Sequence, residues 1–395
     1  YDFLNSFFGN ISRLVSLETP QAYISKLSKR QNETSLISYI IIFNFIGFLI
    51  TLLILFIITI LGLKEKLIGD IRLIFIILSI LFTYLLSLAS LIRLTHDALG
   101  STIEIEKIFS IQAIFSFLLI FISYQYNYLT LKFYFGIQII NQLIIIIPGI
   151  LILIKCHKLK LYSLKLSKKN ILEYSKELYK YCHPLFFYGF VVFFVGVFDR
   201  LILLKFGGLL EQGLYGFSYK ISDLIFIIPS AMSVLIFREL SISVHQNNKK
   251  RIVVLLTKNL FLFYFIASYF AVFFSQNSSY IVELIGGDKF LQSVPVLTII
   301  SFYPLHQVYG QFLGSLLLSY NKTHVFRNIG ILTLIFGLLL SILFMGPKKY
   351  NFLELGALGY AYKMIIYQVI SSNIYLVIVS KIVDLKVKKF IFHQL

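Results

Sequence analysis

The chain has 395 residues, of which 58% are hydrophobic and only 14% are charged. Soluble domains carry about 25% charged residues, and a core surrounded by water cannot absorb so many apolar side chains. A lipid bilayer can, since its hydrocarbon interior accepts helices that are apolar on every side. The composition therefore excludes an ordinary soluble domain and predicts an all-α, polytopic transmembrane helical bundle.

Apolar runs of suitable length mark the candidate spans, because a helix needs roughly 20 residues to cross about 30 Å of hydrocarbon. They predict eleven spans: residues 1–17, 36–62, 71–92, 107–124, 131–155, 183–206, 212–237, 252–274, 291–319, 325–346 and 355–380. The first run is short and polar along one face. Since the chain begins at Tyr1 rather than Met, we expect one further helix before it, which would complete two lobes of six helices around a central cavity.

The excess of 36 basic over 18 acidic residues is compatible with nucleic-acid binding. The basic residues gather instead in short alternate segments between the apolar runs, the positions that keep loops in the cytoplasm. We therefore expect no nucleic-acid partner. The basic segment 381–395 places the carboxyl terminus in the cytoplasm.

The longest basic segment predicts the domain organisation. It separates an amino-terminal lobe at 1–160, with five visible spans, from a carboxyl-terminal lobe at 183–395, with six spans. Residues 161–182 form the predicted cytoplasmic linker. Cys156 and Cys182 flank this segment, and in a reducing compartment we expect free thiols there.

Asp199 and Arg200 stand side by side in an apolar run, "FFVGVFDRLILLKFG". An ionisable group at this depth costs at least about 2.5–3.5 kcal/mol on insertion scales, so such groups face a cavity or a partner. Adjacent helical residues point about 100° apart, so we expect each to find a partner on another helix or to face water. For Arg200, snorkelling to the membrane surface is the alternative.

Other polar residues lie within predicted spans. Lys220 and Asp223 are three apart, and they either pair on one face or line a cavity. Lys363 shares a stripe with Tyr360, Tyr367 and Ser371, and Arg13 shares one with Asn5, Gly9 and Ser16. Two uncharged stripes follow, which serve either a cavity or helix–helix contact: Gln138, Asn141 and Gln142 in one span, and His306, Gln307 and Gln311 in another.

The buried charges are four basic and two acidic, and a net-cationic interior suits an anionic headgroup such as a phosphorylated sugar. An enzyme would need a constellation of acids, bases or metal ligands. The sequence has no HExxH, no phosphate-cradling GxxxxGKS and no Cys–His metal spacing. We therefore expect no catalytic residues, no metal and no cofactor.

Three segments carry a resemblance to a known family. "FDRLILLKFGGLLEQGLYGFSYKISDLIFIIPSAMSVLIFREL" (198–240), "IVELIGGDKFLQSVPVL" (281–297) and "GALGYAYKMIIYQ" (356–368) are similar, in order and spacing, to the second half of polysaccharide flippases. These are the O-antigen and capsule repeat-unit transporters of the multidrug/oligosaccharidyl-lipid/polysaccharide exporter superfamily. The resemblance covers residues 180–381, approximately. Before residue 180 it depends only on hydropathy and loop spacing.

The resemblance implies alternating access and movement of undecaprenyl-diphosphate-linked oligosaccharide to the outer leaflet of a bacterial inner membrane, coupled to an ion. Arg13, Arg200, Lys220 and Lys363 would receive the diphosphate or acidic sugars, and Asp199 or Asp223 would be charge partners or coupling sites. Membrane lipids, a polysaccharide polymerase and a chain-length regulator are the partners that it suggests. A drug exporter of the same superfamily and a membrane enzyme of polysaccharide assembly remain the alternatives.

Overall fold

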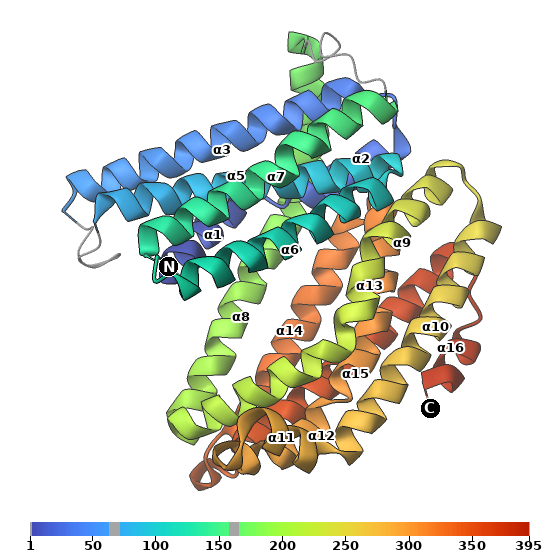
Figure 1. Cartoon of the computed structure of the whole chain (residues 1–395). Coiled ribbons are helices and arrows are strands. Elements are labelled where there is room, and N and C mark those ends of the chain that lie inside the picture. Colours follow the sequence, from blue (N-terminus) through green and yellow to red (C-terminus); the bar gives the residue numbers. More distant parts are fainter. Residues whose placement is uncertain (1, 63–71, 129, 158–165, 395) are drawn as a thin grey trace. The chain divides into compact units, whose positions relative to one another are not determined.

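A computed structural model describes residues 2–62, 72–128, 130–157 and 166–394. Side chains are outside the described set at residues 2, 3, 5–7, 10, 13, 156 and 157. The chain divides into two compact units, Tyr1–Phe186 and Phe187–Leu395, with the boundary inside one long helix (Figure 1). Every regular element in the described ranges is a helix, which confirms the predicted all-α class.

Unit 1 is organised around α5 (Leu73–Leu99), which packs against five other helices among the described residues of the unit. These are α1 (Asp2–Ser16), α2 (Thr19–Lys29), α3 (Thr34–Ile60), α6 (Thr102–Gln125) and α7 (Leu131–His157). Two apolar clusters form its core, one where α1, α3, α5 and α7 meet and one where α5, α6 and α7 meet. Because α5 is shared by both clusters, it fixes the positions of its neighbours.

Unit 2 is built around α13 (Tyr303–Ser319) and α15 (Gly356–Val383), which pack against each other. Around them lie the end of α8 (Lys168–Asp223), α9 (Ile227–His245), α10 (Lys249–Gln276), α11 (Ser278–Gly286), α12 (Val294–Ile300), α14 (Thr323–Met345) and α16 (Val387–Gln394). Its larger apolar core joins α9, α10, α13, α15 and α16. A second core surrounds the end of α8 and the start of α15.

A kink at Gly208 divides α8. Its φ of 81° and ψ of −177° lie in a region that is essentially restricted to glycine. The kink falls between the predicted spans 183–206 and 212–237, so two helical segments follow each other there without an intervening loop. The predicted span 291–319 is likewise divided, into α12 and α13, with Pro304 in the first turn of α13.

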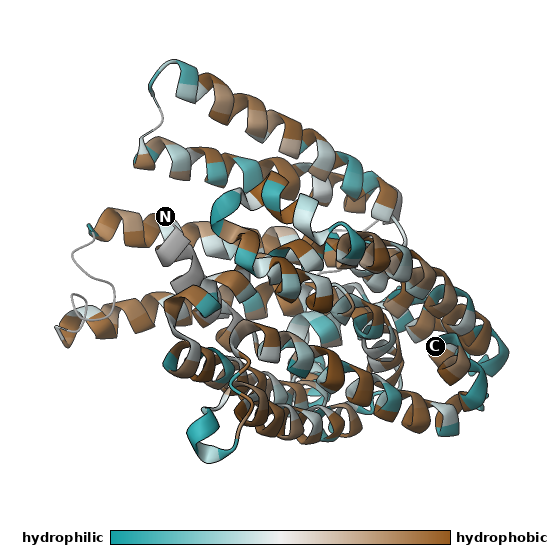
Figure 2. Ribbon diagram, turned by 90° about the horizontal axis from the view of Figure 1, so that it is seen from below, coloured by the Kyte–Doolittle hydropathy of each residue, from teal (hydrophilic) through white to brown (hydrophobic). Residues whose placement is uncertain are grey.

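Within the described residues, eight helical segments are long and apolar enough to cross a membrane, one of them the merged stretch 168–245. With 15 residues, α1 is too short, and the break before α13 leaves that helix with 17. Apolar residues dominate the long helices (Figure 2), and α6 buries only Ile105 and Ser123. Such outward-facing apolar surface is what a helix in lipid requires, so the chain is a multi-pass membrane protein.

Residues 168–182 of the predicted linker form the first turns of α8. Its charged residues alternate at helical spacing with apolar ones, and Tyr174, Leu178, Tyr181 and Cys182 are buried in unit 1. This part of the predicted linker is therefore an amphipathic helix, and its role in joining the two lobes stays a prediction. Cys182 is a free thiol, as predicted, whereas the side chain of Cys156 lies outside the described residues.

Candidate functional site

Asp199 is the centre of a buried polar cluster in unit 2. Its side chain lies on α8, and its partners come from α14 and α15. The Lys363 ammonium nitrogen lies 2.5 Å from Oδ2, and the Ser341 hydroxyl donates to Oδ1 at 2.5 Å. Tyr360 donates a longer hydrogen bond to Oδ2 at 3.5 Å. A carboxylate this deep is stable because each oxygen accepts from a donor and an opposite charge is adjacent.

Two tyrosines of the stripe predicted on α15 flank the Lys363 ammonium. Its ammonium lies 5.2 Å from the ring centroid of Tyr360 and 5.6 Å from that of Tyr367, which are one turn away on either side. On α14, a Cβ at Gly337 would come within 3.1–3.3 Å of Tyr367 and of the Lys363 stem. Glycine at 337 therefore makes room for both side chains, and Ser341 follows one turn later on the same face.

Arg200 points away from this ion pair, as the 100° offset between neighbours predicts. Its guanidinium carbon lies 4.8 Å from the ring centroid of Tyr215 and 5.8 Å from that of Tyr360. These two rings stack on each other with centroids 4.1 Å apart. Cation–π contacts hold a guanidinium in place without using its N–H donors. Among the described residues no carboxylate pairs with Arg200, so its donors remain available.

An open groove of about 430 Å³ runs along α8 beside Arg200. Its walls are apolar, formed by Val192, Phe193, Gly196, Val197, Leu201 and Leu204, and Gln212 adds one amide. Oε1 of that amide has no hydrogen-bond partner within the described part of the chain. The groove thus combines one cation and one amide with an otherwise apolar surface.

The cluster has a formal charge of +1. Asp199 neutralises Lys363, which is 4% exposed, so this lysine is engaged inside the protein rather than available as a free cation. Arg200 supplies the remaining charge. The sequence predicted only that Asp199, Arg200 and Lys363 are ionisable residues within membrane spans. The structure shows that Asp199 and Lys363 form a buried ion pair and that Arg200 is not part of it.

The other predicted charges are placed differently. Lys220 and Asp223 are both exposed, and no ion pair joins them in the described structure. The pair that their spacing allows therefore does not form among the described residues, and the alternative, a cavity role, stays a prediction. Arg13 belongs to α1, but its side chain lies outside the described residues, so its role stays a prediction.

The two uncharged stripes lie on separate units. In unit 1, Asn141 of α7 donates to the Ser116 hydroxyl of α6 at 2.8 Å, and Gln142 is buried nearby while Gln138 is half-buried. The contact with Ser116 agrees with the alternative reading, in which amides join helices. In unit 2, His306, Gln307 and Gln311 follow α13, and the Gln368 amide donates to the backbone oxygen of His306 at 3.4 Å.

Ser341 and Tyr215 are members of the cluster that sequence reasoning missed. Ser341 lies alone in an apolar run, and a single serine in a membrane helix commonly bonds to its own backbone, as this one also does toward Gly337. The Gly337–Ser341 spacing of four residues is the available signal. Within the described residues no group of acidic, His and Cys side chains is arranged to hold a metal ion.

Comparisons with known proteins identify the fold. No family model matches the chain, and no curated protein matches it. Among solved structures, a variant of the Vibrio cholerae MATE transporter VcmN has a TM-score of 0.78 at 13% identity, covering 98% of this chain and 88% of that one. An outward-facing multidrug resistance MATE family transporter of the MOP superfamily has a TM-score of 0.72 at 13% identity, covering 96% and 86%.

A MOP superfamily transporter from Pyrococcus furiosus, described by the reversed polarity of its binding pocket, has a TM-score of 0.69 at 12% identity, covering 96% and 86%. At identities this low, structural similarity indicates a shared fold but not a shared activity. The chain therefore has the fold of MATE transporters of the MOP superfamily, and the predicted polytopic helical-bundle class is confirmed.

Proposed function

We propose that this protein is a membrane transporter that moves an undecaprenyl-diphosphate-linked oligosaccharide, an O-antigen or capsule repeat unit, from the cytoplasmic to the outer leaflet by alternating access. The fold of MOP superfamily transporters supports transport in general. The resemblance of residues 198–240, 281–297 and 356–368 to polysaccharide flippases supports this substrate class.

The observation that carries the proposal is the state of Arg200. A guanidinium held on two aromatic rings, with no carboxylate partner among the described residues, presents a fork of donors that matches a phosphate. The adjacent groove offers apolar walls to a polyprenyl chain. One cation beside an apolar groove suits an amphiphilic anion better than a cationic drug, which Arg200 would repel.

Lys363 has a different role in this proposal from the one that the sequence indicated. Its ammonium is committed to Asp199, so it supports the cluster rather than contacting the diphosphate directly. The pair holds the Tyr360 hydroxyl, and the Tyr360 ring in turn stacks beside Arg200. Arg200 is therefore the residue whose removal tests substrate binding.

The test uses purified protein in liposomes that carry a fluorescent polyprenyl-diphosphate-linked sugar in one leaflet. Losing a charge-assisted hydrogen bond of about 1.5–3 kcal/mol corresponds to a rate reduction of roughly tenfold to hundredfold for Arg200→Ala. Lys205→Ala is the matched control, because it removes an exposed cation from the same helix and should stay within about twofold. Wild-type transport rates in Arg200→Ala, with the protein folded, would refute the assignment.

A drug exporter is the second candidate, favoured by the multidrug resistance transporters among the similar structures. Accumulation of ethidium in the same liposomes separates the two. An exporter of cationic drugs should transport ethidium as well or better after Arg200→Ala, since a positive charge is removed. A lipid-linked oligosaccharide transporter should transport no ethidium in either form.

A further inference from the structure

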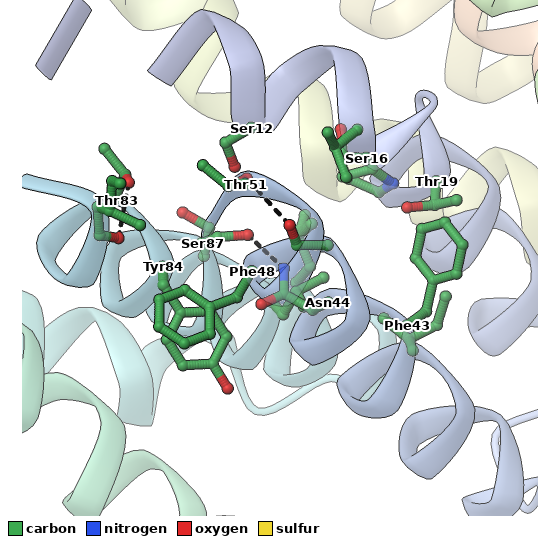
Figure 3. Close-up of a pocket in the computed structure, with 18 residues that line it drawn as sticks. Ser12, Ser16, Thr19, Phe43, Asn44, Phe48, Thr51, Thr83, Tyr84 and Ser87 are labelled. Atoms are coloured by element: carbon green, nitrogen blue, oxygen red, sulfur yellow. Dashed lines mark hydrogen bonds between the residues drawn. The ribbon is translucent and has the colours of Figure 1, made fainter. Parts of the chain in front are cut away.

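Unit 1 contains a pocket of a different chemical character from the unit 2 cluster. It lies among α1, α3, α5 and the first turn of α2 and has a volume of about 90 Å³ (Figure 3). The described residues that line it include hydroxyl groups, one amide and aromatic rings, and none of them carries a charge. Charged substrate groups therefore have no counter-ion there, and a neutral ligand is indicated.

Two threonine hydroxyls of this pocket are available as acceptors. The hydroxyls of Thr51 and Thr83 donate to the backbone oxygens of Gly47 and Ile80, each at 2.9 Å. A hydroxyl that donates to its own helix keeps its lone pairs for another donor. Both threonines are more than nine-tenths buried.

Asn44 completes this set of acceptors. Its Nδ2 donates to the Ser87 hydroxyl at 2.5 Å, whereas its buried Oδ1 has no hydrogen-bond partner in the described structure. A buried acceptor without a donor is costly, since it loses its water and gains nothing in return. The unused oxygen therefore points to a ligand that donates hydrogen bonds.

The remaining walls are aromatic. The rings of Phe48 and Tyr84 stack with centroids 4.5 Å apart, and Phe43 lines the pocket apart from them, beside Thr19 (Figure 3). Acceptors beside ring faces suit a molecule that has hydroxyl donors on its edge and C–H groups on its face, which is the chemistry of a sugar ring.

The volume narrows the ligand further. The volume of about 90 Å³ is roughly sixfold larger than the smallest cavity, about 10–15 Å³, that holds one water molecule, so the pocket has room for a small ligand. Pockets for drug-sized ligands measure about 300–1,000 Å³, so this pocket is too small for one.

We infer that this pocket binds one neutral sugar residue, with Asn44, Thr51 and Thr83 accepting from its hydroxyls and the stacked Phe48–Tyr84 pair contacting its C–H groups. The inference deepens the proposed function and rests on it, because it names the part of the oligosaccharide that unit 1 would recognise. Uncharged sugars would be selected by this pocket, while the anionic part of the substrate is left to Arg200.

The sequence has no tryptophan, which allows a direct test. Tyr84→Trp places a single fluorophore in the pocket, and Tyr124→Trp places one at an exposed site, 68% accessible, on α6. Methyl glucoside, methyl galactoside and methyl N-acetylglucosaminide are titrated into each protein. We expect at least one glycoside to shift the Tyr84→Trp emission saturably and none to shift that of Tyr124→Trp.

Two further variants locate the contacts in the Tyr84→Trp background. Asn44→Leu and Thr51→Val should each weaken glycoside binding by roughly twofold to tenfold, the effect of one lost neutral hydrogen bond. Thr59→Val is the matched control, since Thr59 bonds to its own backbone in the same helix but does not line the pocket. Saturation-transfer NMR on the unmodified protein repeats the measurement without the fluorophore.

Three results would overturn the inference: no glycoside binding in either measurement, binding that is unaffected by both Asn44→Leu and Thr51→Val, or a saturable response to sodium or tetramethylammonium instead. Methyl glycosides carry neither diphosphate nor lipid, so their binding does not depend on Arg200. If glycosides bind but transport is unaffected by Arg200→Ala, the proposed function alone is refuted. If Arg200→Ala slows transport but no glycoside binds, the sugar pocket alone is refuted.

Discussion

The Asp199–Lys363 ion pair should be strongly coupled, and the structure sets the size of the effect. The two charged atoms are 2.5 Å apart and the side chains are 4–5% exposed. At an effective dielectric constant of about 20, their attraction is about 7 kcal/mol, which is offset by the cost of removing both groups from water. Removing one partner leaves the other buried and uncompensated.

A lone buried ammonium or carboxylate can lose or gain a proton, which caps the penalty at about 4–5 kcal/mol at pH 7. Asp199→Asn and Lys363→Met should therefore each lower the free energy of unfolding by about 3–4 kcal/mol. The double variant leaves no buried charge and should lose less than either single variant. The expected coupling energy is about 3 kcal/mol or more.

The assay is a double-mutant cycle of unfolding free energies, measured in mixed micelles by denaturant titration. The matched control is Arg93–Glu106 in unit 1, a pair of nearly equal length at 2.6 Å whose side chains are 47% and 41% exposed. Exposed pairs contribute about 0.2–1 kcal/mol. A coupling energy for Asp199–Lys363 no larger than that of the control would refute the reasoning, because burial would then have no effect on the pair.

Two predictions concern groups outside this cluster. Burial, together with the charges of Lys26 and Arg30, lowers the pKa of Lys29 in α2 to about 8. Between pH 8 and about 10.5 the unfolded chain therefore binds more protons than the folded protein, so the melting temperature should rise with pH over that range. Lys29→Met should flatten this rise. Gly208→Ala should cost about 1–3 kcal/mol in denaturant unfolding from its backbone angles alone. Gly213→Ala, at a helical site with equally open surroundings, should stabilise by about 0.5–1 kcal/mol, and equal effects of the two substitutions would contradict the assigned kink.

The membrane class and most spans could be predicted, because the apolar run that crosses a bilayer is a local property of the sequence. The orientation of Asp199 and Arg200 toward different neighbours also followed from local geometry, namely the angle between successive helical residues. Which neighbours they meet did not follow. Ser341 and Lys363 are separated from Asp199 by 142 and 164 residues, and only the packing of α8, α14 and α15 brings them together.

Unit 1 shows the same limit for uncharged groups. Asn44, Gly47 and Thr51 lie at helical spacing in α3, yet the run around them is so apolar that hydropathy describes it as a span and nothing more. Spacing within one helix says which residues share a face, but not whether a neighbouring helix satisfies them. The pocket that Asn44 lines, rather than its contact with Ser87 of α5, distinguishes this site from a helix–helix contact.

The adjacency of Asp199 and Arg200 has a physical consequence for an anionic ligand. Were Arg200 able to reach Asp199, it would be neutralised and the Lys363 ammonium would be left as the buried cation, behind the apolar side chains of unit 2. Because Asp199 instead binds the buried Lys363, the unpaired positive charge of the cluster is that of Arg200, beside the groove. Arg200 is also the better of the two for phosphate, since its fork stays charged and presents several donors. An acid placed next to a base within a membrane helix thus keeps that base available.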